Sequence, residues 1–198
     1  MRTPNALVPY ALMLAIVAAG ALWRLGDEVA LSPRAAGQGE AMVGGAFSLV
    51  DAGGGRVTDA DFRGRFMLVF FGFTYCPDVC PTALAVIAAA LDRLGDKAGR
   101  VVPIFVSVDP ERDSPVAVGE YVASFGARFV GLTGSAQDIA VAAKAYRVYY
   151  KKRAIEGGSY TVDHSSVIYL MGPDGKYVTH FAAEMGPDAM ADAIAERL

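Results

Sequence analysis

The chain has 198 residues, 54% of them hydrophobic, and its 18 basic and 21 acidic side chains give a formal charge of −3. This length suits one domain of ordinary size with a short appendage, and the hydrophobic fraction excludes a disordered chain. The net negative charge argues against a nucleic-acid binder that relies on phosphate neutralisation, and two cysteines are too few for a disulfide-framework protein.

The N-terminal part of the sequence predicts a membrane anchor at residues 1–24. A stretch without charged residues runs from Asn5 to Trp23, and as a helix it would reach about 28 Å, close to the hydrocarbon thickness of a bilayer. Trp23 would lie at the interface, where aromatic residues are enriched. A cleaved signal peptide is the alternative, because small residues such as Ala19 and Ala21 could suit a peptidase. Both alternatives indicate export.

Residues 25–45 mix Gly, Pro, Ser and charge, which predicts a tether, and the domain is expected over 46–198. The expected strands are apolar runs, at 47–50, 56–57, 66–73, 101–108, 129–132, 167–171 and 177–181. The expected helices have an apolar stripe or N-terminal cap residues, at about 81–94, 115–125, 136–146 and from 187 onward. This order predicts an α/β fold with a mixed central sheet flanked by helices, in which Pro103 makes the first half of its strand an edge or irregular segment.

Both cysteines lie in one short motif, CPDVCP, between the most apolar strand and a helix. Functional sites of α/β sheets occur at such strand ends. Pro81 suits the first position of a helix, which predicts Cys80 at or near the N-cap and Cys76 in the preceding loop. The dipole of that helix would stabilise thiolates, so both sulfurs are expected to be reactive.

The residues alone leave three interpretations of this pair. A structural disulfide across so short a loop would stabilise the fold by only about 2 kcal/mol, which makes it a poor cross-link. Two inert buried thiols are disfavoured by the two prolines and the aspartate around them. Redox exchange or metal binding is favoured, and these two uses compete because an oxidised pair offers no thiolate.

A third ligand would distinguish metal binding from thiol exchange, and the chain has two histidines. His164 is the favoured candidate because it lies in a loop before a strand, after the turn at Gly157-Gly158. His180 lies inside a predicted hairpin strand and is expected to be an ordinary surface or hydrogen-bonded residue. Two thiolates and an imidazole suit Cu(I), while zinc also accepts such a set. A blue-copper site is less apt, because it uses one cysteine and two histidines.

Three motifs in register connect the chain to a known family. They are FGFTYCPDVCP from Phe71 to Pro81, VSVDPERD from Val106 to Asp113, and VDHS from Val162 to Ser165. With these motifs the sequence resembles the Sco/SenC family of thioredoxin-like copper chaperones for cytochrome c oxidase, over about residues 45–198.

The resemblance implies a thioredoxin-like fold with a membrane tether and copper bound by Cys76, Cys80 and His164. Cys76 and Cys80 would also be a redox-active pair with a reversible disulfide. The implied function is delivery of copper to the CuA site of the oxidase during its assembly, or reduction of the cysteines of that site. Asp109 occupies the position of a family acid implicated in handling Cu(II), although a turn aspartate explains it equally well. Asp78 could tune Cys80 or cap the helix, and a cap is favoured.

The resemblance also implies partners and a location. The partners are the copper-bearing subunit of cytochrome c oxidase, an upstream copper donor and a thioredoxin-like reductant that reopens the disulfide; no nucleic acid is expected. The short segment before the uncharged stretch leaves no room for a mitochondrial transit peptide. The expected location is therefore the bacterial inner membrane, with a single span and the domain in the periplasm.

The rival function is that of a membrane-tethered thiol-disulfide oxidoreductase without a physiological metal, which reduces cysteines of the oxidase or of other exported proteins. Compared with a standard thioredoxin, the chain has CxxxC in place of CxxC and no proline directly before the strand at 167–171. A noncatalytic assembly factor that docks through aromatic residues has less support, because aromatic residues beside a buried strand usually belong to the core; the candidates are Phe71, Phe73, Tyr75 and Tyr160.

Overall fold

The computed structural model describes residues 43–198. The expected anchor at 1–24 and most of the expected tether at 25–45 lie outside the described residues, so this division of the chain stays a prediction. Among the helices of residues 43–198, none is both long enough and apolar enough to cross a bilayer.

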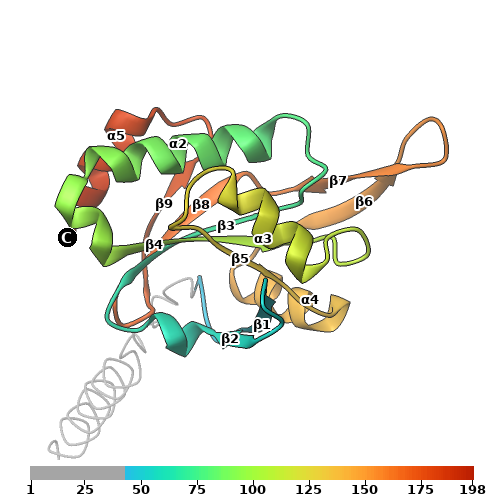
Figure 1. The fold of residues 1–198 in the computed structure, drawn as a ribbon, viewed down its shortest axis with the longest axis horizontal. Helices are drawn as coiled ribbons and strands as arrows, with labels where there is room; N and C mark the ends of the chain where they lie inside the picture. Colours follow the sequence, from blue (N-terminus) through green and yellow to red (C-terminus); the bar gives the residue numbers. More distant parts are fainter. Residues whose placement is uncertain (1–42) are drawn as a thin grey trace, which may run out of the picture. The chain divides into compact units, whose positions relative to one another are not determined.

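A seven-stranded mixed sheet forms the centre of the described domain (Figure 1). The strand order is β2-β1-β5-β4-β3-β8-β9, in which β3, β4 and β5 are parallel and the other pairs are antiparallel. The strands are β1 (Ser48–Asp51), β2 (Arg56–Thr58), β3 (Phe66–Gly72), β4 (Val101–Ser107), β5 (Val130–Thr133), β8 (Val167–Met171) and β9 (Tyr177–Ala182). Every residue of β3 and β4 is buried, which explains their continuous apolar runs.

Helices pack around this sheet, and local sequence signals explain several of their ends. Within residues 43–198 they are α2 (Val79–Arg93), α3 (Pro115–Ala123), α4 (Ala136–Ala145), α5 (Pro187–Ala195) and the 3-10 helices η1 (Asp59–Phe62) and η2 (Gly95–Arg100). The hydroxyls of Ser114 and Ser135 accept backbone hydrogen bonds at the starts of α3 and α4. Gly95 has a φ of 54° just after α2, a conformation that favours glycine. α2 and α5 pack side by side in Figure 1.

The two faces of the central strands pack against different helices. The Phe105 ring on β4 lies 6.3 Å from that of Phe70 on β3 and 5.5 Å from that of Tyr121 on α3. Side chains alternate along a strand, so Phe71 points to the opposite face. Its ring lies 5.3 Å from that of Tyr146, at the end of α4. α3 and α4 therefore cover opposite faces of the sheet, as expected for an α/β fold.

Pro103 lies in a central strand, but the prediction that it makes the first half of this strand an edge segment is confirmed locally. β4 runs between β3 and β5. Pro103 is in register with Leu68 of β3, whereas β5 pairs only with the segment from Ile104 to Val106. At Pro103, β4 has a paired neighbour on one side only, which is where a missing N–H is tolerated.

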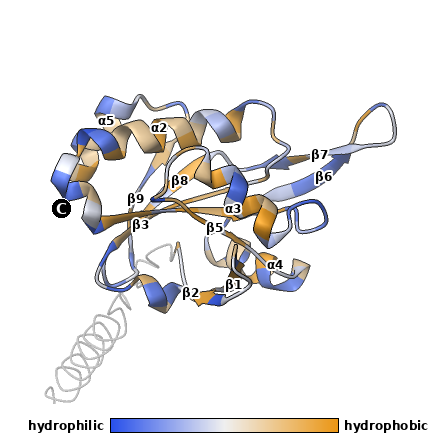
Figure 2. Ribbon diagram, viewed as in Figure 1, coloured by the Kyte–Doolittle hydropathy of each residue, from blue (hydrophilic) through white to orange (hydrophobic). Residues whose placement is uncertain are grey.

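A projecting hairpin, which the sequence did not predict, is formed by β6 (Tyr150–Ala154) and β7 (Tyr160–His164) (Figure 1). It is a two-stranded sheet of its own, and β6 is exposed at every position after Tyr150. Figure 2 shows β6 in the blue of hydrophilic residues. The apolar alternation on which strand prediction rests is therefore missing here, and His164 ends a strand instead of lying in a loop.

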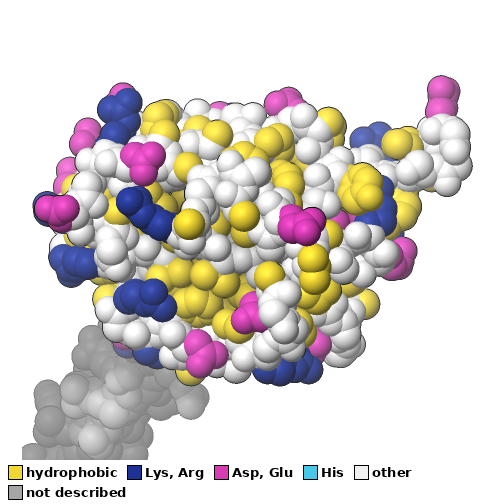
Figure 3. Space-filling view, in the orientation of Figure 1, with side chains coloured by type: hydrophobic (Ala, Val, Ile, Leu, Met, Phe, Trp, Pro, Cys, Tyr) yellow, Lys and Arg dark blue, Asp and Glu magenta, His cyan; other side chains and the backbone are white. Residues whose placement is uncertain are grey.

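Charged side chains of both signs are interspersed on the face of the domain drawn in Figure 3. Across the domain several pair directly: Arg56 lies 3.2 Å from Asp138, and Arg128 lies 3.5 Å from Asp92. Mixed signs on one face give no extended positive field that would attract an anionic partner there.

Candidate metal centre

Three side chains with metal-binding atoms converge beyond the end of β3. The Sγ atoms of Cys76 and Cys80 and a ring nitrogen of His164 all lie within 4.8 Å of one another. Cys76 lies in the loop after β3, Cys80 in the first turn of α2, and His164 at the end of β7. Cys80 Sγ is 3.4 Å from His164 Nε2. The structure thus brings together the three residues singled out in the sequence and forms a candidate metal site.

The Cys loop, residues 73–78, begins where β3 ends at Gly72. The Cys76 amide donates a hydrogen bond to the Phe73 carbonyl at 3.3 Å, which turns the chain toward α2. Gly72 is required sterically, because a Cβ at this position would lie 2.6 Å from Cys80 Sγ and 2.9 Å from a ring carbon of Phe105. Glycine therefore lets the buried sulfur pack directly against β3.

α2 begins earlier than the sequence predicts. Asp78 is at the N-cap position, so Cys80 is the second and Pro81 the third helical residue. Proline is tolerated there because amides of the first turn have no partner within the helix. The Asp78 carboxylate makes no capping hydrogen bond, so the favoured cap role is not seen. Instead, the Cys80 amide donates to Cys76 Sγ at 3.4 Å.

The two thiols are unbridged and differ in environment. Cys80 is fully buried, whereas Cys76 is partly exposed. A hydrogen bond from the Cys80 thiol is the main cause that lowers the pKa of Cys76 to about 5; burial opposes it, and the amides of Asp78 and Cys80 contribute further lowering. The same hydrogen bond, together with burial, raises the pKa of Cys80. At neutral pH Cys76 is therefore the thiolate and the nucleophile of the pair.

Aromatic packing and one hydrogen bond orient the ring of His164. Its centroid lies 6.0 Å from that of Phe70 and 5.8 Å from that of Phe73, both in edge-on geometry. Nδ1 lies 3.1 Å from the Ser165 carbonyl oxygen. Because a carbonyl only accepts, Nδ1 carries a proton in this contact, and Nε2 is the ring nitrogen that faces Cys80; in the neutral ring Nε2 offers the lone pair. A metal-ligating imidazole needs this tautomer.

Asp109 and His180 lie outside the converging group. Asp109 is fully buried, and its carboxylate accepts hydrogen bonds from Arg112 Nε at 2.5 Å and from the Tyr160 hydroxyl at 2.8 Å. His180 is exposed on β9, where it is hydrogen-bonded to Tyr177 and stacked on its ring. His180 thus has the environment expected of an ordinary surface histidine.

Asp113 supports the site, although the sequence identified it only as part of a motif. Its buried carboxylate accepts hydrogen bonds from the Thr74 amide at 2.9 Å, the Thr74 hydroxyl at 2.6 Å and the Ser107 hydroxyl at 2.5 Å. These bonds attach the Cys loop to the end of β4. The available signal was an acidic residue shortly after a buried strand, at the sheet edge where sites of α/β folds occur.

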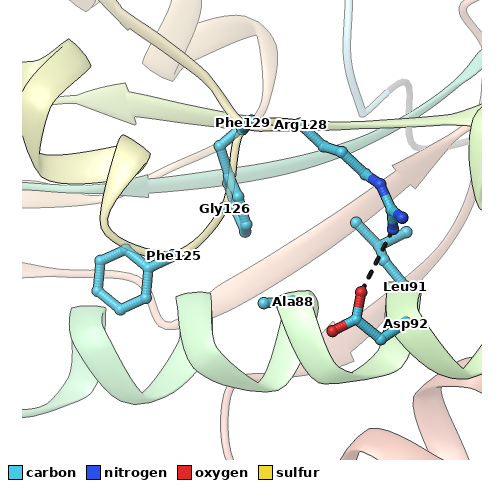
Figure 4. Close-up of a pocket in the computed structure, with 8 residues that line it drawn as sticks. Ala88, Leu91, Asp92, Phe125, Gly126, Arg128 and Phe129 are labelled. Carbon is cyan, nitrogen blue, oxygen red and sulfur yellow. Dashed lines mark hydrogen bonds and ion pairs between the residues drawn. The ribbon is translucent and has the colours of Figure 1, made fainter.

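A pocket of about 260 Å³ lies away from this centre, between α2 and the segment after α3 (Figure 4). Its lining includes Leu91, Phe125 and the ion pair of Arg128 with Asp92 at 3.5 Å. No cysteine or histidine lines it, so the thiol chemistry of the domain is located elsewhere.

A known protein family matches most of this sequence. The family model described as SCO1/SenC matches residues 35–198. The mitochondrial Protein SCO1 homolog 1 of Arabidopsis thaliana is 44% identical over 161 residues, which cover 81% of this chain and 48% of that protein. The chain therefore spans about half the length of this relative.

Solved structures resemble the described domain. ScoI of Bradyrhizobium japonicum with copper bound has a TM-score of 0.73 and 44% sequence identity, and the match covers 79% of this chain and 99% of that chain. BsSco is described as having a disulfide switch and as a member of the Sco family of cytochrome c oxidase assembly proteins. It has a TM-score of 0.61 and 29% identity, over 77% of this chain and 89% of that chain. These similarities confirm the thioredoxin-like α/β fold with a mixed sheet.

Proposed function

Because this chain belongs to the SCO1/SenC family, we propose that it is a copper metallochaperone that delivers copper to the CuA site of cytochrome c oxidase during assembly. The convergence of Cys76, Cys80 and His164 within 4.8 Å carries this proposal. Zinc accepts the same donors. Soft thiolates with an imidazole match Cu(I), however, and the copper-bound structure of the similar Bradyrhizobium japonicum protein supports copper.

The three ligands would contribute differently to binding the cargo. Cys76 is partly exposed and already a thiolate, so it is the first sulfur available to an incoming ion. Cys80 must release its proton, because the thiolate is the ligand. His164 presents Nε2 without a change of tautomer. Three ligands from this chain leave room for a ligand from the donor or acceptor protein, which allows copper to pass between proteins.

The proposal includes partners and a location. The acceptor is the copper-bearing subunit of the oxidase, an upstream protein donates copper, and a thioredoxin-like reductant keeps the thiols reduced in an oxidising compartment. The uncharged stretch from Asn5 to Trp23 supports a single span in the bacterial inner membrane with the domain in the periplasm.

The difference between the two thiols favours thiol-disulfide exchange as a second candidate function. The Cys76 thiolate would attack a partner disulfide and release one partner thiolate. The Cys80 thiolate, formed by proton loss, would then attack Cys76 in the mixed disulfide and release the second. The chain ends as the Cys76–Cys80 disulfide and the partner as a dithiol, so electrons balance. The similarity to BsSco, described with a disulfide switch, supports this chemistry.

An anaerobic Cu(I) titration distinguishes the two functions. The reduced full chain in detergent is titrated against a chromophoric Cu(I) chelator, beside His164→Ala and the control His180→Ala. Near-stoichiometric binding that His164→Ala strongly weakens and His180→Ala leaves unchanged is expected for the chaperone. Full disulfide-reductase activity in all three proteins, with weak copper binding that depends on neither histidine, would instead support the oxidoreductase.

A further inference from the structure

The hairpin that carries His164 has little core of its own. β6 and β7 form a separate two-stranded sheet, and within β7 only Val162 is buried. A lone two-stranded hairpin is marginally stable in water. The position of the His164 ring therefore depends on the contacts that attach this hairpin to the rest of the domain.

At the other end of β7, Tyr160 is attached to the loop between β4 and α3. Its hydroxyl donates to Asp109 Oδ1 at 2.8 Å, and its carbonyl accepts from Arg112 Nη1 at 2.9 Å. The Arg112 guanidinium lies 3.8 Å from the centroid of the Tyr160 ring, within cation-π range. Arg112 Nε also pairs with Asp109 Oδ2 at 2.5 Å. These three residues form a closed set of contacts, which we call the Tyr160 clamp.

The clamp also contacts the Cys loop. The Arg112 guanidinium lies 5.7 Å from the Phe73 ring and 4.9 Å from the Tyr75 ring. Phe73 in turn packs edge-on against the His164 ring. The same segment after β4 holds the Cys loop through the buried carboxylate of Asp113. One short segment thus attaches both parts of the chain that must meet to form the site.

We propose that the Tyr160 clamp positions His164 against the two sulfurs and so sets the affinity for copper without contacting the metal. The inference rests on the proposed copper-binding function. Tyr160 and His164 are on the same strand, about 13 Å apart along it. Without the clamp the hairpin has lost one of its attachments, and fewer molecules present the complete ligand set. The apparent affinity for copper falls in proportion to the fraction of molecules that present all three ligands.

A double-mutant cycle with His164→Ala tests the clamp in the reduced full chain, with Cu(I) affinity measured by chelator competition. Arg112→Gln is expected to weaken binding about tenfold to a hundredfold, the range typical of residues that orient metal ligands. Tyr160→Phe keeps the ring and removes only the hydroxyl, so its loss should be smaller. In the His164→Ala background neither substitution should weaken binding further.

Arg153→Gln is the matched control for the clamp. Arg153 lies on the same hairpin but pairs with Asp163 across it, at 3.2 Å, and makes no contact with the clamp segment among the interactions of the described residues. Its substitution is expected to leave Cu(I) affinity unchanged.

The outcomes separate the clamp from the metal site. The proposed function requires that the wild-type chain binds Cu(I) and that His164→Ala binds it more weakly. If both results are obtained while Arg112→Gln and Tyr160→Phe bind Cu(I) like wild type, the clamp is overturned. Equal losses of Cu(I) affinity in the wild-type and His164→Ala backgrounds would also overturn the clamp, because they indicate general structural damage.

A second readout needs no copper. In the NMR spectrum of the metal-free chain, Arg112→Gln should shift or broaden the ring signals of His164 and leave those of His180 in place. If Arg112→Gln does not fold, Tyr160→Phe serves in the same comparison. Unchanged His164 signals in folded variants would contradict the clamp even if copper binding itself were absent.

Discussion

Cys80 Sγ lies 3.4 Å from His164 Nε2, although 84 residues separate the two in the chain. Cys80 is fully buried in the first turn of α2, directly against Gly72. His164 ends a strand of the projecting hairpin, which is not part of the central sheet. The contact therefore joins the core of the domain to a segment with little core of its own. A metal ion bound here would link the two.

Alkylation of Cys76 should remain fast well below neutral pH. Its pKa is lowered to about 5, mainly by the hydrogen bond from the Cys80 thiol, and only the thiolate reacts. The rate with iodoacetamide, followed by peptide mass spectrometry, should be nearly constant from about pH 8 to about pH 6 and fall as the pH drops through about 5. In Cys80→Ala the inflection should move up toward about 8.5. A wild-type inflection near that value would contradict the prediction.

Formation of the Cys76–Cys80 disulfide should abolish copper binding, because it consumes both thiolates. The measurement is chelator competition with the diamide-oxidised chain, before and after reduction, and reduction should restore binding. His164→Ala should still form the disulfide, since the imidazole takes no part in it. Copper held by the oxidised chain as tightly as by the reduced chain would mean that other residues bind the metal.

Gly72→Ala should destabilise the domain and displace Cys80. The added Cβ would lie 2.6 Å from Cys80 Sγ and 2.9 Å from the Phe105 ring, and overpacking of a core typically costs about 1–3 kcal/mol. Chemical denaturation measures the free energy of unfolding. Gly99→Ala is the control, because its Cβ would meet no atom within 4 Å. Equal stabilities of the two variants would show that the prediction is wrong.

Asp113→Asn should lower the free energy of unfolding by about 1–3 kcal/mol. The buried carboxylate accepts hydrogen bonds on both oxygens, from Thr74 and Ser107, whereas an amide replaces one acceptor with a donor. Asp92→Asn is the exposed control and should change stability by less than about 0.5 kcal/mol, because surface ion pairs contribute little. Urea denaturation measures both variants. If Asp113→Asn changes the free energy of unfolding as little as the control does, the proposed role of this carboxylate is contradicted.

Local patterns were enough to predict most elements of the described domain. The apolar run at 66–73 became β3, and Ser114 and Ser135 begin their helices as expected, because these signals act on neighbouring residues. Pro103 correctly marked a segment paired on one side only, although the central place of β4 depends on the order of strands in the sheet. Prediction failed at the hairpin of β6 and β7, because β6 is exposed and lacks an apolar pattern.

The order of residues along the chain was sufficient to identify the candidate metal ligands and the candidate redox pair. The signals were two cysteines before a helix, a histidine before a strand, and three motifs in register. Motifs are linear, so they can be recognised without a fold. Packing alone determined that Cys76 is the thiolate, that Cys80 is buried beside His164, and that Asp109, Arg112 and Tyr160 meet. Burial and side-chain hydrogen bonds act between segments distant in the sequence, and spacing along the chain does not encode them.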